Sequence, residues 1–274
     1  MDFFTNLNID LIYSLEQLVI GTVLGLLIGM TGIGAGVLIM PVLLFVSHVD
    51  PAVAVGTSLL FSVLSKAYGV REHWKLGSID RETNLSLSAG AIPMVIGASL
   101  GVNKLKQFVS PEAFNFWMKI FLTILVFIIS LYLFWDAFKK DQQNIYKCGD
   151  PLTTPQKIKG AAYGGVVGIL VGATSIGGGV FIIPILTGVF KLSAKCVVGT
   201  SILISVALTL AGSGVYLYYG NVNILVALLL VLGSLPGIKL GAKAAHSMSS
   251  LALKRMMASL AFISFLSMVF GIKH

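Results

Sequence analysis

Two glycine-rich stretches with neighbouring hydroxyl side chains are the segments of this sequence best suited to bind a small ligand. The first reads Thr31-Gly32-Ile33-Gly34-Ala35-Gly36, and the second reads Thr174-Ser175-Ile176-Gly177-Gly178-Gly179. Glycine lets the backbone turn where a Cβ would clash, and it brings backbone N–H groups close to a ligand. The residues that follow can open a half-helix, and free N–H groups at a helix start attract anions. The pattern therefore favours an anion as the ligand.

Two further triplets could add hydroxyl groups to such a site. Gly56-Thr57-Ser58 and Gly199-Thr200-Ser201 open the hydrophobic segment after each glycine-rich stretch, and we expect them to lie near helix N-termini. Both features have a plain structural alternative, because small residues let helices pack closely and Ser or Thr hydroxyls often bond to their own helix. The expected ligand-binding residues are Thr31, Gly32, Gly34, Ala35, Gly36, Thr57, Ser58, Thr174, Ser175, Gly177, Gly178, Gly179, Thr200 and Ser201.

The chain is an internal duplication, because both motifs recur at a constant distance of 143 residues. The same offset aligns Pro41 with Pro184 and Pro93 with Pro236 without a gap. A polar stretch joins the two copies. We therefore expect a first transmembrane repeat at residues 1–138, a polar linker at 139–160 and a second repeat at 161–274.

The composition is that of a membrane protein. The chain is 56% hydrophobic and 11% charged, whereas a soluble domain carries about a quarter charged residues. Its net charge of +8 comes from basic residues between apolar segments and forms no stripe with interleaved aromatics. We therefore expect a lipid bilayer around the protein and no nucleic acid partner. Four hydrophobic segments are expected in each half: 15–46, 53–70, 85–102 and 114–138, then 161–190, 197–218, 224–240 and 253–270.

The first hydrophobic segment of each half is too long for one simple span, at about 30 residues or 45 Å of helix, and glycines interrupt it. We expect two half-helices that double back, so that each half crosses the membrane an odd number of times. On this arrangement fourteen basic residues fall on one side and three on the other, whereas single crossings give no bias. The expected fold is an all-α polytopic membrane protein with two inverted repeats, each a broken or re-entrant helical hairpin plus three transmembrane helices.

Few other side chains suggest chemistry. Lys66 and Lys239 are the ionisable candidates singled out within the hydrophobic segments, and both are expected near segment ends, where a lysine snorkels to the interface. Cys148 and Cys196 lie in unlike surroundings and predict neither a metal site nor a disulfide framework. No paired nucleophile and base stands out. The sequence therefore predicts no enzyme activity, no catalytic residue, no metal and no cofactor.

The doubled motif resembles that of the TauE/SafE family of sulfite and organosulfonate exporters. The residues that carry the resemblance are Gly21, Gly25, Gly29, Gly32, Gly34, Gly36 and Pro41, then Gly164, Gly168, Gly172, Gly177, Gly178, Gly179 and Pro184. The resemblance covers nearly the whole chain and implies a multi-pass carrier of small sulfur-containing anions in the plasma (inner) membrane, driven by an ion gradient. Ala35 departs from the second copy, where Gly178 stands, so the two half-sites are expected to be unequal.

These observations predict a secondary transporter that works by alternating access around a central site made by the two glycine-rich helix breaks. Its partners would be a small anionic substrate and a coupling ion, either a proton or sodium. The alternative is a passive anion channel of the same architecture. Saturable flux that depends on an ion gradient distinguishes the carrier from the channel.

Overall fold

The fold was analysed in a computed structural model that describes residues 11–31, 39–40, 42–47, 49–75, 79–136, 148–175, 179, 181–192, 194–247 and 250–271. Within these residues the chain is helical and contains no β-strand. The helices are α1 (Leu11–Thr31), η2 (Val42–Val46), α3 (Pro51–Lys75), α4 (Arg81–Phe108), α5 (Pro111–Asp136), α6 (Thr154–Thr174), α7 (Ile182–Pro184), η3 (Ile185–Val189), α8 (Ala194–Tyr218), α9 (Ile224–Ser247) and α10 (Ser250–Gly271). The protein is an all-α membrane protein, as the composition predicts.

Several of these helices are long and apolar enough to span a bilayer. The regions 81–108, 111–132 and 199–218 meet the length and hydropathy that a span requires. Three shorter apolar helical regions, at 13–28, 51–67 and 224–240, lie in α1, α3 and α9. Apolar helices of this kind satisfy their own backbone groups inside lipid, which is why helices suit such a sequence.

The first hydrophobic segment of each half folds back on itself. After α1 the chain returns through η2, and Ser47 Oγ lies 3.3 Å from Gln17 Oε1 in the early turns of α1. In the second half the chain returns through α7 and η3, and a Cβ added to Gly160 would lie 3.1 Å from Phe190 Cζ. Both returning segments thus end beside the beginning of the helix that precedes them.

The second returning segment owes its shape to a proline. Pro184 ends α7, and it has no backbone N–H to continue the α-helical pattern. The next turns form the π-helix η3, in which Phe190 N donates to the carbonyl of Ile185 at 3.1 Å. Single π-helical turns of this kind are frequent at functional sites.

The two halves also share their helix boundaries. Residues 143 positions apart begin and end α1 and α6, η2 and η3, and α3 and α8. Prolines at the same offset, Pro93 and Pro236, lie inside α4 and α9. The structural boundaries therefore follow the repeat seen in the sequence.

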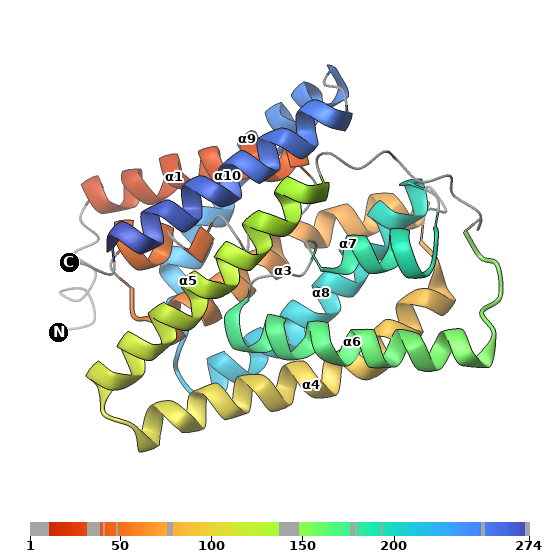
Figure 1. The fold of residues 1–274 in the computed structure, drawn as a ribbon. Coiled ribbons are helices and arrows are strands. Elements are labelled where there is room, and N and C mark those ends of the chain that lie inside the picture. The colour runs from red at the N-terminus through yellow and green to blue at the C-terminus, as the bar shows by residue number, and fades with distance from the viewer. Residues whose placement is uncertain are drawn as a thin grey trace, which may run out of the picture.

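Close helix pairs link the two halves, as α4 and α6 show at the lower edge of the bundle (Figure 1). A methyl group at Gly164 would overlap the backbone of Leu87, and one at Gly168 would overlap the backbone of Ala91. The pair α1 and α9 repeats the arrangement, with Gly21 against the backbone of Leu230. These motif glycines lie outside the helix breaks and serve close helix packing, which is the structural alternative considered above.

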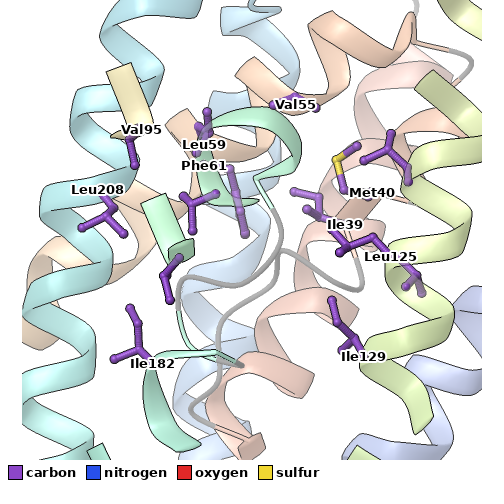
Figure 2. Close-up of a cluster of buried hydrophobic side chains, with 14 of the residues drawn as sticks. Ile39, Met40, Val55, Leu59, Phe61, Val95, Leu125, Ile129, Ile182 and Leu208 are labelled. Atoms are coloured by element: carbon purple, nitrogen blue, oxygen red, sulfur yellow. The ribbon is translucent and has the colours of Figure 1, made fainter. Parts of the chain in front are cut away.

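The helices α3 and α8 cross the middle of the bundle in opposite directions (Figure 1). Gly56 lies against Tyr216, Gly212 lies against Leu59, and Lys66 reaches Ser205. Contacts nearer the C-terminus of α3 involve residues nearer the N-terminus of α8, so the two helices are antiparallel. Buried apolar side chains surround them, including Leu59 and Leu208 in the cluster of Figure 2.

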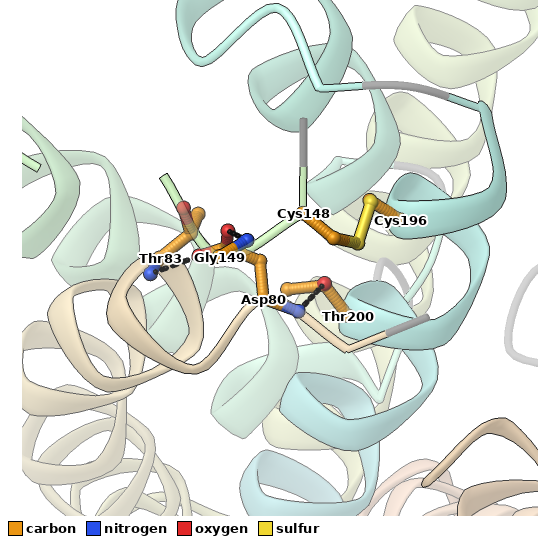
Figure 3. The surroundings of a disulfide bond; sticks show 6 residues. All are labelled: Asp80, Thr83, Cys148, Gly149, Cys196 and Thr200. Carbon is orange, nitrogen blue, oxygen red and sulfur yellow. Dashed lines mark hydrogen bonds between the residues drawn. A yellow bond between two sulfur atoms is a disulfide. The ribbon is translucent and has the colours of Figure 1, made fainter. Parts of the chain in front are cut away.

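A disulfide connects the linker to the start of α8, contrary to the expectation from the sequence. Cys148 and Cys196 are bonded, with Cα atoms 5.7 Å apart (Figure 3). The expectation failed because 48 residues separate the two cysteines in sequence, and spacing alone does not report which segments the fold brings together. Asp80 ties down the same corner, since its carboxylate accepts hydrogen bonds from Thr83 N and Gly149 N, at 2.8 and 2.9 Å.

Candidate functional site

The two halves of the repeat meet at a pair of serine hydroxyls. Ser58 belongs to α3 of the first half, and Ser175 follows α6 of the second half. The Ser58 hydroxyl donates to Ser175 Oγ. It also lies 3.6 Å from Met40 Sδ on the first returning segment. Both serines are buried, so this contact joins three segments of the predicted site inside the protein.

Ser175 ends α6 in a backbone conformation that favours glycine. Its φ of 60° and ψ of −6° are left-handed, and its N–H donates to the Val171 carbonyl at 2.7 Å. A side chain in this region costs free energy, and such residues concentrate at functional sites. The first half carries Gly32 at the equivalent position. A serine at such a position suggests that its hydroxyl matters.

The last turn of α6 is held by hydroxyls from two neighbouring helices. Ser99 Oγ of α4 and Tyr216 Oη of α8 donate to the carbonyl of Gly172, at 3.1 and 3.0 Å. Tyr216 is fully buried. Asn103 continues the network by donating to the Ser99 carbonyl at 2.8 Å. The helix end beside Ser175 is therefore fixed by side chains, although its carbonyl groups have no partner further along the helix.

The two Gly-Thr-Ser triplets were expected to open their helices, but they lie in the second turn of each helix. The helix α3 begins at Pro51 and α8 at Ala194, five residues before each triplet. The Thr57 hydroxyl accepts a hydrogen bond from Asn223 N at 2.9 Å, and the Thr200 hydroxyl accepts one from Asp80 N at 2.8 Å. The threonines thus hold the loops before α9 and α4 in equivalent ways.

Ser58 and Ser201 lie at different depths along the central helices. The contacts between α3 and α8 place Ser58 level with residue 213 of α8. Ser201 is twelve residues away along that helix, or about 18 Å at 1.5 Å per residue. One small anion does not span that distance. The two hydroxyls therefore lie at separate positions along the central helices, and not in the single shell expected from the sequence.

The remaining predicted residues are placed as follows. The Thr174 hydroxyl donates to the Leu170 carbonyl of its own helix at 2.6 Å. Gly179 is buried, and its carbonyl accepts from Ile183 N at 3.0 Å. Thr31 ends α1, and its side chain is not described. Gly32, Gly34, Ala35, Gly36, Gly177 and Gly178 lie outside the described residues.

A row of buried polar residues on α3 and α8 was missed from the sequence. Ser62 lies one turn after Ser58, and Ser205, Thr209 and Ser213 follow Ser201 at intervals of four residues. All are buried. Spacing of four residues places side chains on one face of a helix, so the interval was a usable signal. Among them, Ser205 lies at the contact between the two antiparallel central helices, because it accepts the hydrogen bond from Lys66.

Lys66 lies near the end of the apolar region 51–67, as expected, but its side chain turns toward α8. It lies within α3, which extends nine residues further, to Lys75. Its ammonium donates to Ser205 Oγ at 2.5 Å, near the middle of α8. Lys239 differs from it, because the Lys239 side chain is exposed on α9. Lys66 is thus near the end of the apolar region but not near the end of the helix, because α3 continues beyond that region.

Comparison with known proteins gives a consistent result. The family model described as sulfite exporter TauE/SafE matches residues 18–268. The probable membrane transporter protein YjnA of Bacillus subtilis (strain 168) is 31% identical over 261 residues, which cover 93% of this chain and 100% of that protein. The probable membrane transporter protein YunE of the same organism is 32% identical over 237 residues, covering 82% and 85%. No solved structure matches the chain significantly.

Proposed function

The chain belongs to the TauE/SafE family of sulfite exporters, and we propose that it is a secondary transporter of small sulfur-containing anions in the plasma membrane. Its relatives are membrane transporter proteins by name, and the family description names sulfite. The observation that carries the proposal is the contact between Ser58 and Ser175. It joins the central helix of one half to the helix break of the other half.

Hydrogen-bond donors at this contact suit an oxyanion. The hydroxyls of Ser58 and Ser175 lie where α6 has ended and the glycine-rich stretch begins. We propose that backbone N–H groups of residues 34–36 and 177–179 add further donors as the substrate passes. Thr31, Thr174 and Ser201 would complete the set, whereas Thr57 and Thr200 would support it through the neighbouring loops.

The proposed mechanism is alternating access between two inverted halves. The antiparallel course of α3 and α8, which occupy equivalent positions in the two repeats, supports an inverted relation. Each half also contributes a hairpin that folds back, and transporters with inverted repeats place their substrate at such broken helices. Movement of one half against the other would expose the path to each side in turn.

The test is sulfite flux into liposomes that contain the purified protein. We expect saturable flux that a proton or sodium gradient accelerates. Ser58→Ala and Ser175→Ala should each reduce the flux at least about tenfold, because each removes a donor to a charged substrate. Ser259→Ala is the matched control, since the Ser259 hydroxyl is exposed and bonds within α10.

The outcomes distinguish carrier from channel and test the site. Flux that never saturates and ignores ion gradients would support the passive channel. Folded Ser58→Ala and Ser175→Ala proteins that carry sulfite at the original rate would remove the two serines from the substrate path.

A further inference from the structure

We propose that Lys66 is the counter-charge of the transported anion, and that the path selects small anions without a cationic group. The inference rests on the proposed function. It identifies a positive charge that can balance the anion, which the neutral serine hydroxyls cannot do. It follows from where the fold places this ammonium and from what surrounds it.

The Lys66 ammonium lies in the interface of the two central helices. Its partner Ser205 is 1% exposed and lies within the candidate span at residues 199–218. Lysine is costly at such a depth, and ionisable residues within spans usually mark the route of a substrate or ion. Lys66 lies near the end of the apolar region 51–67, but its ammonium is directed to the buried Ser205.

A protein anion to balance Lys66 is missing from the described side chains. Its hydrogen-bond partner is a neutral serine, and the described residues give it no ion pair. Asp80 is the one buried acid among the described residues, and Thr83 N and Gly149 N occupy its carboxylate oxygens. Lys66 is half-buried, and an ammonium that is even partly withdrawn from water without a counter-ion is unfavourable. A bound anion would supply the missing charge.

The pseudo-symmetry places Lys66 near the centre of the transport path. The residue equivalent to Lys66 in the second half is Thr209, and the residue equivalent to its partner Ser205 is Ser62. All four lie on α3 and α8, between the levels of Ser58 and Ser201. The charge therefore lies where a substrate passing between the two hydroxyl positions must approach it.

This environment also defines the substrate class. Sulfite and sulfoacetate carry only negative charge at neutral pH, so Lys66 would attract them. Taurine carries an ammonium as well as a sulfonate, and the described part of the path offers no acid to receive that ammonium. Repulsion from Lys66 would then oppose taurine. The proposal predicts binding of sulfite and sulfoacetate and exclusion of taurine.

The experiment compares Lys66→Thr with the double variant Lys66→Thr/Thr209→Lys in purified protein and in liposomes. Threonine is the natural residue at the equivalent position of the second half, so the single variant introduces a side chain that this interface already accommodates. The double variant returns one ammonium to the interface, within reach of Ser62. Lys106→Thr is the control, because Lys106 also bonds to a neutral side chain, Asn221, but at the end of α4.

Binding and flux are measured for sulfite, sulfoacetate, taurine and phosphate. Lys66→Thr should weaken sulfite and sulfoacetate binding at least about 30-fold, as expected when one member of a buried charge pair is removed. The double variant should recover at least half of the lost flux, and Lys106→Thr should match the unmodified protein. Gel filtration establishes that each variant is folded.

Each of three results would contradict a different part of the proposal. Folded Lys66→Thr protein with unchanged sulfite affinity rejects the counter-charge and leaves the proposed function standing. Taurine binding as tight as that of sulfoacetate rejects the substrate class. Unmodified protein that carries phosphate but no sulfur-containing anion rejects the proposed function, while loss of phosphate flux in Lys66→Thr would retain the role of the charge.

Discussion

Ser175 shows how one residue can combine a conformational cost with a functional benefit. Its left-handed backbone is strained for any side chain, and Gly32 occupies the equivalent position in the first half. Its hydroxyl nevertheless bonds to Ser58 across the boundary between the halves. If the hydroxyl serves the substrate, stability and transport should respond differently to its removal.

Ser175→Gly tests this separation. Relief of the left-handed backbone gains about 1–2 kcal/mol, and loss of the hydrogen bond costs about 0.5–1.5 kcal/mol. The free energy of unfolding should therefore change by less than about 1.5 kcal/mol, while sulfite flux falls at least about tenfold. Unfolding is followed in detergent and flux in liposomes. A glycine variant with full flux would show that the hydroxyl serves the structure alone.

At the level of elements, α4 and α6 approach closely because glycines lie on the face of α6 that meets α4. Gly168 faces the backbone of Ala91, and a methyl group there has no room. Gly165 lies on the same helix, but a methyl group there would remain 3.7 Å from Met94 Cγ. The two glycines are thus a matched pair with opposite surroundings.

Gly168→Ala should destabilise the protein by about 1–3 kcal/mol, because two backbones must separate to accept the methyl group. Gly165→Ala should be neutral or stabilising by up to about 1 kcal/mol, because alanine favours the helix. Thermal unfolding in detergent measures both. Equal effects of the two substitutions would show that the helix contact is looser than described.

At the level of the whole molecule, the linker and the beginnings of α4, α6 and α8 gather at one end. Cys148 is bonded to Cys196 there, and Glu82 forms an ion pair with Lys157 at 2.8 Å. The excess of basic residues predicts that this end faces the cytoplasm. Disulfides are rare in that compartment, so the two cysteines are expected to be reduced in growing cells.

The two cysteines are the only ones in the chain and report the orientation directly. After mild reduction, a membrane-impermeant maleimide should label the half-buried Cys148 in inside-out vesicles and leave it unlabelled in intact cells. A cysteine-free variant with Ser110→Cys is the control. Ser110 is exposed between α4 and α5, at the other end of α4, and should label only from outside. Labelling of Cys148 or Cys196 in intact cells would reverse the proposed orientation.

The sequence by itself determined the helical membrane class and the constant offset of the repeat, and it predicted where the helices break. Hydropathy is a local property and the offset of 143 residues is a periodic one, so both can be read from the sequence alone. The helix boundaries of α3 and α8 accordingly recur at that offset. The family resemblance rested on the same glycines and prolines, and the family match agrees with it.

Only the tertiary structure decided which residues meet. The disulfide, the contact of Ser58 with Ser175 and the approach of Lys66 to Ser205 join residues 48, 117 and 139 positions apart. Such pairings depend on the axial register and the rotation of antiparallel helices, which no local sequence pattern determines. For the same reason the sequence placed Ser58 and Ser201 in one shell, whereas the register of α3 against α8 separates them along the bundle.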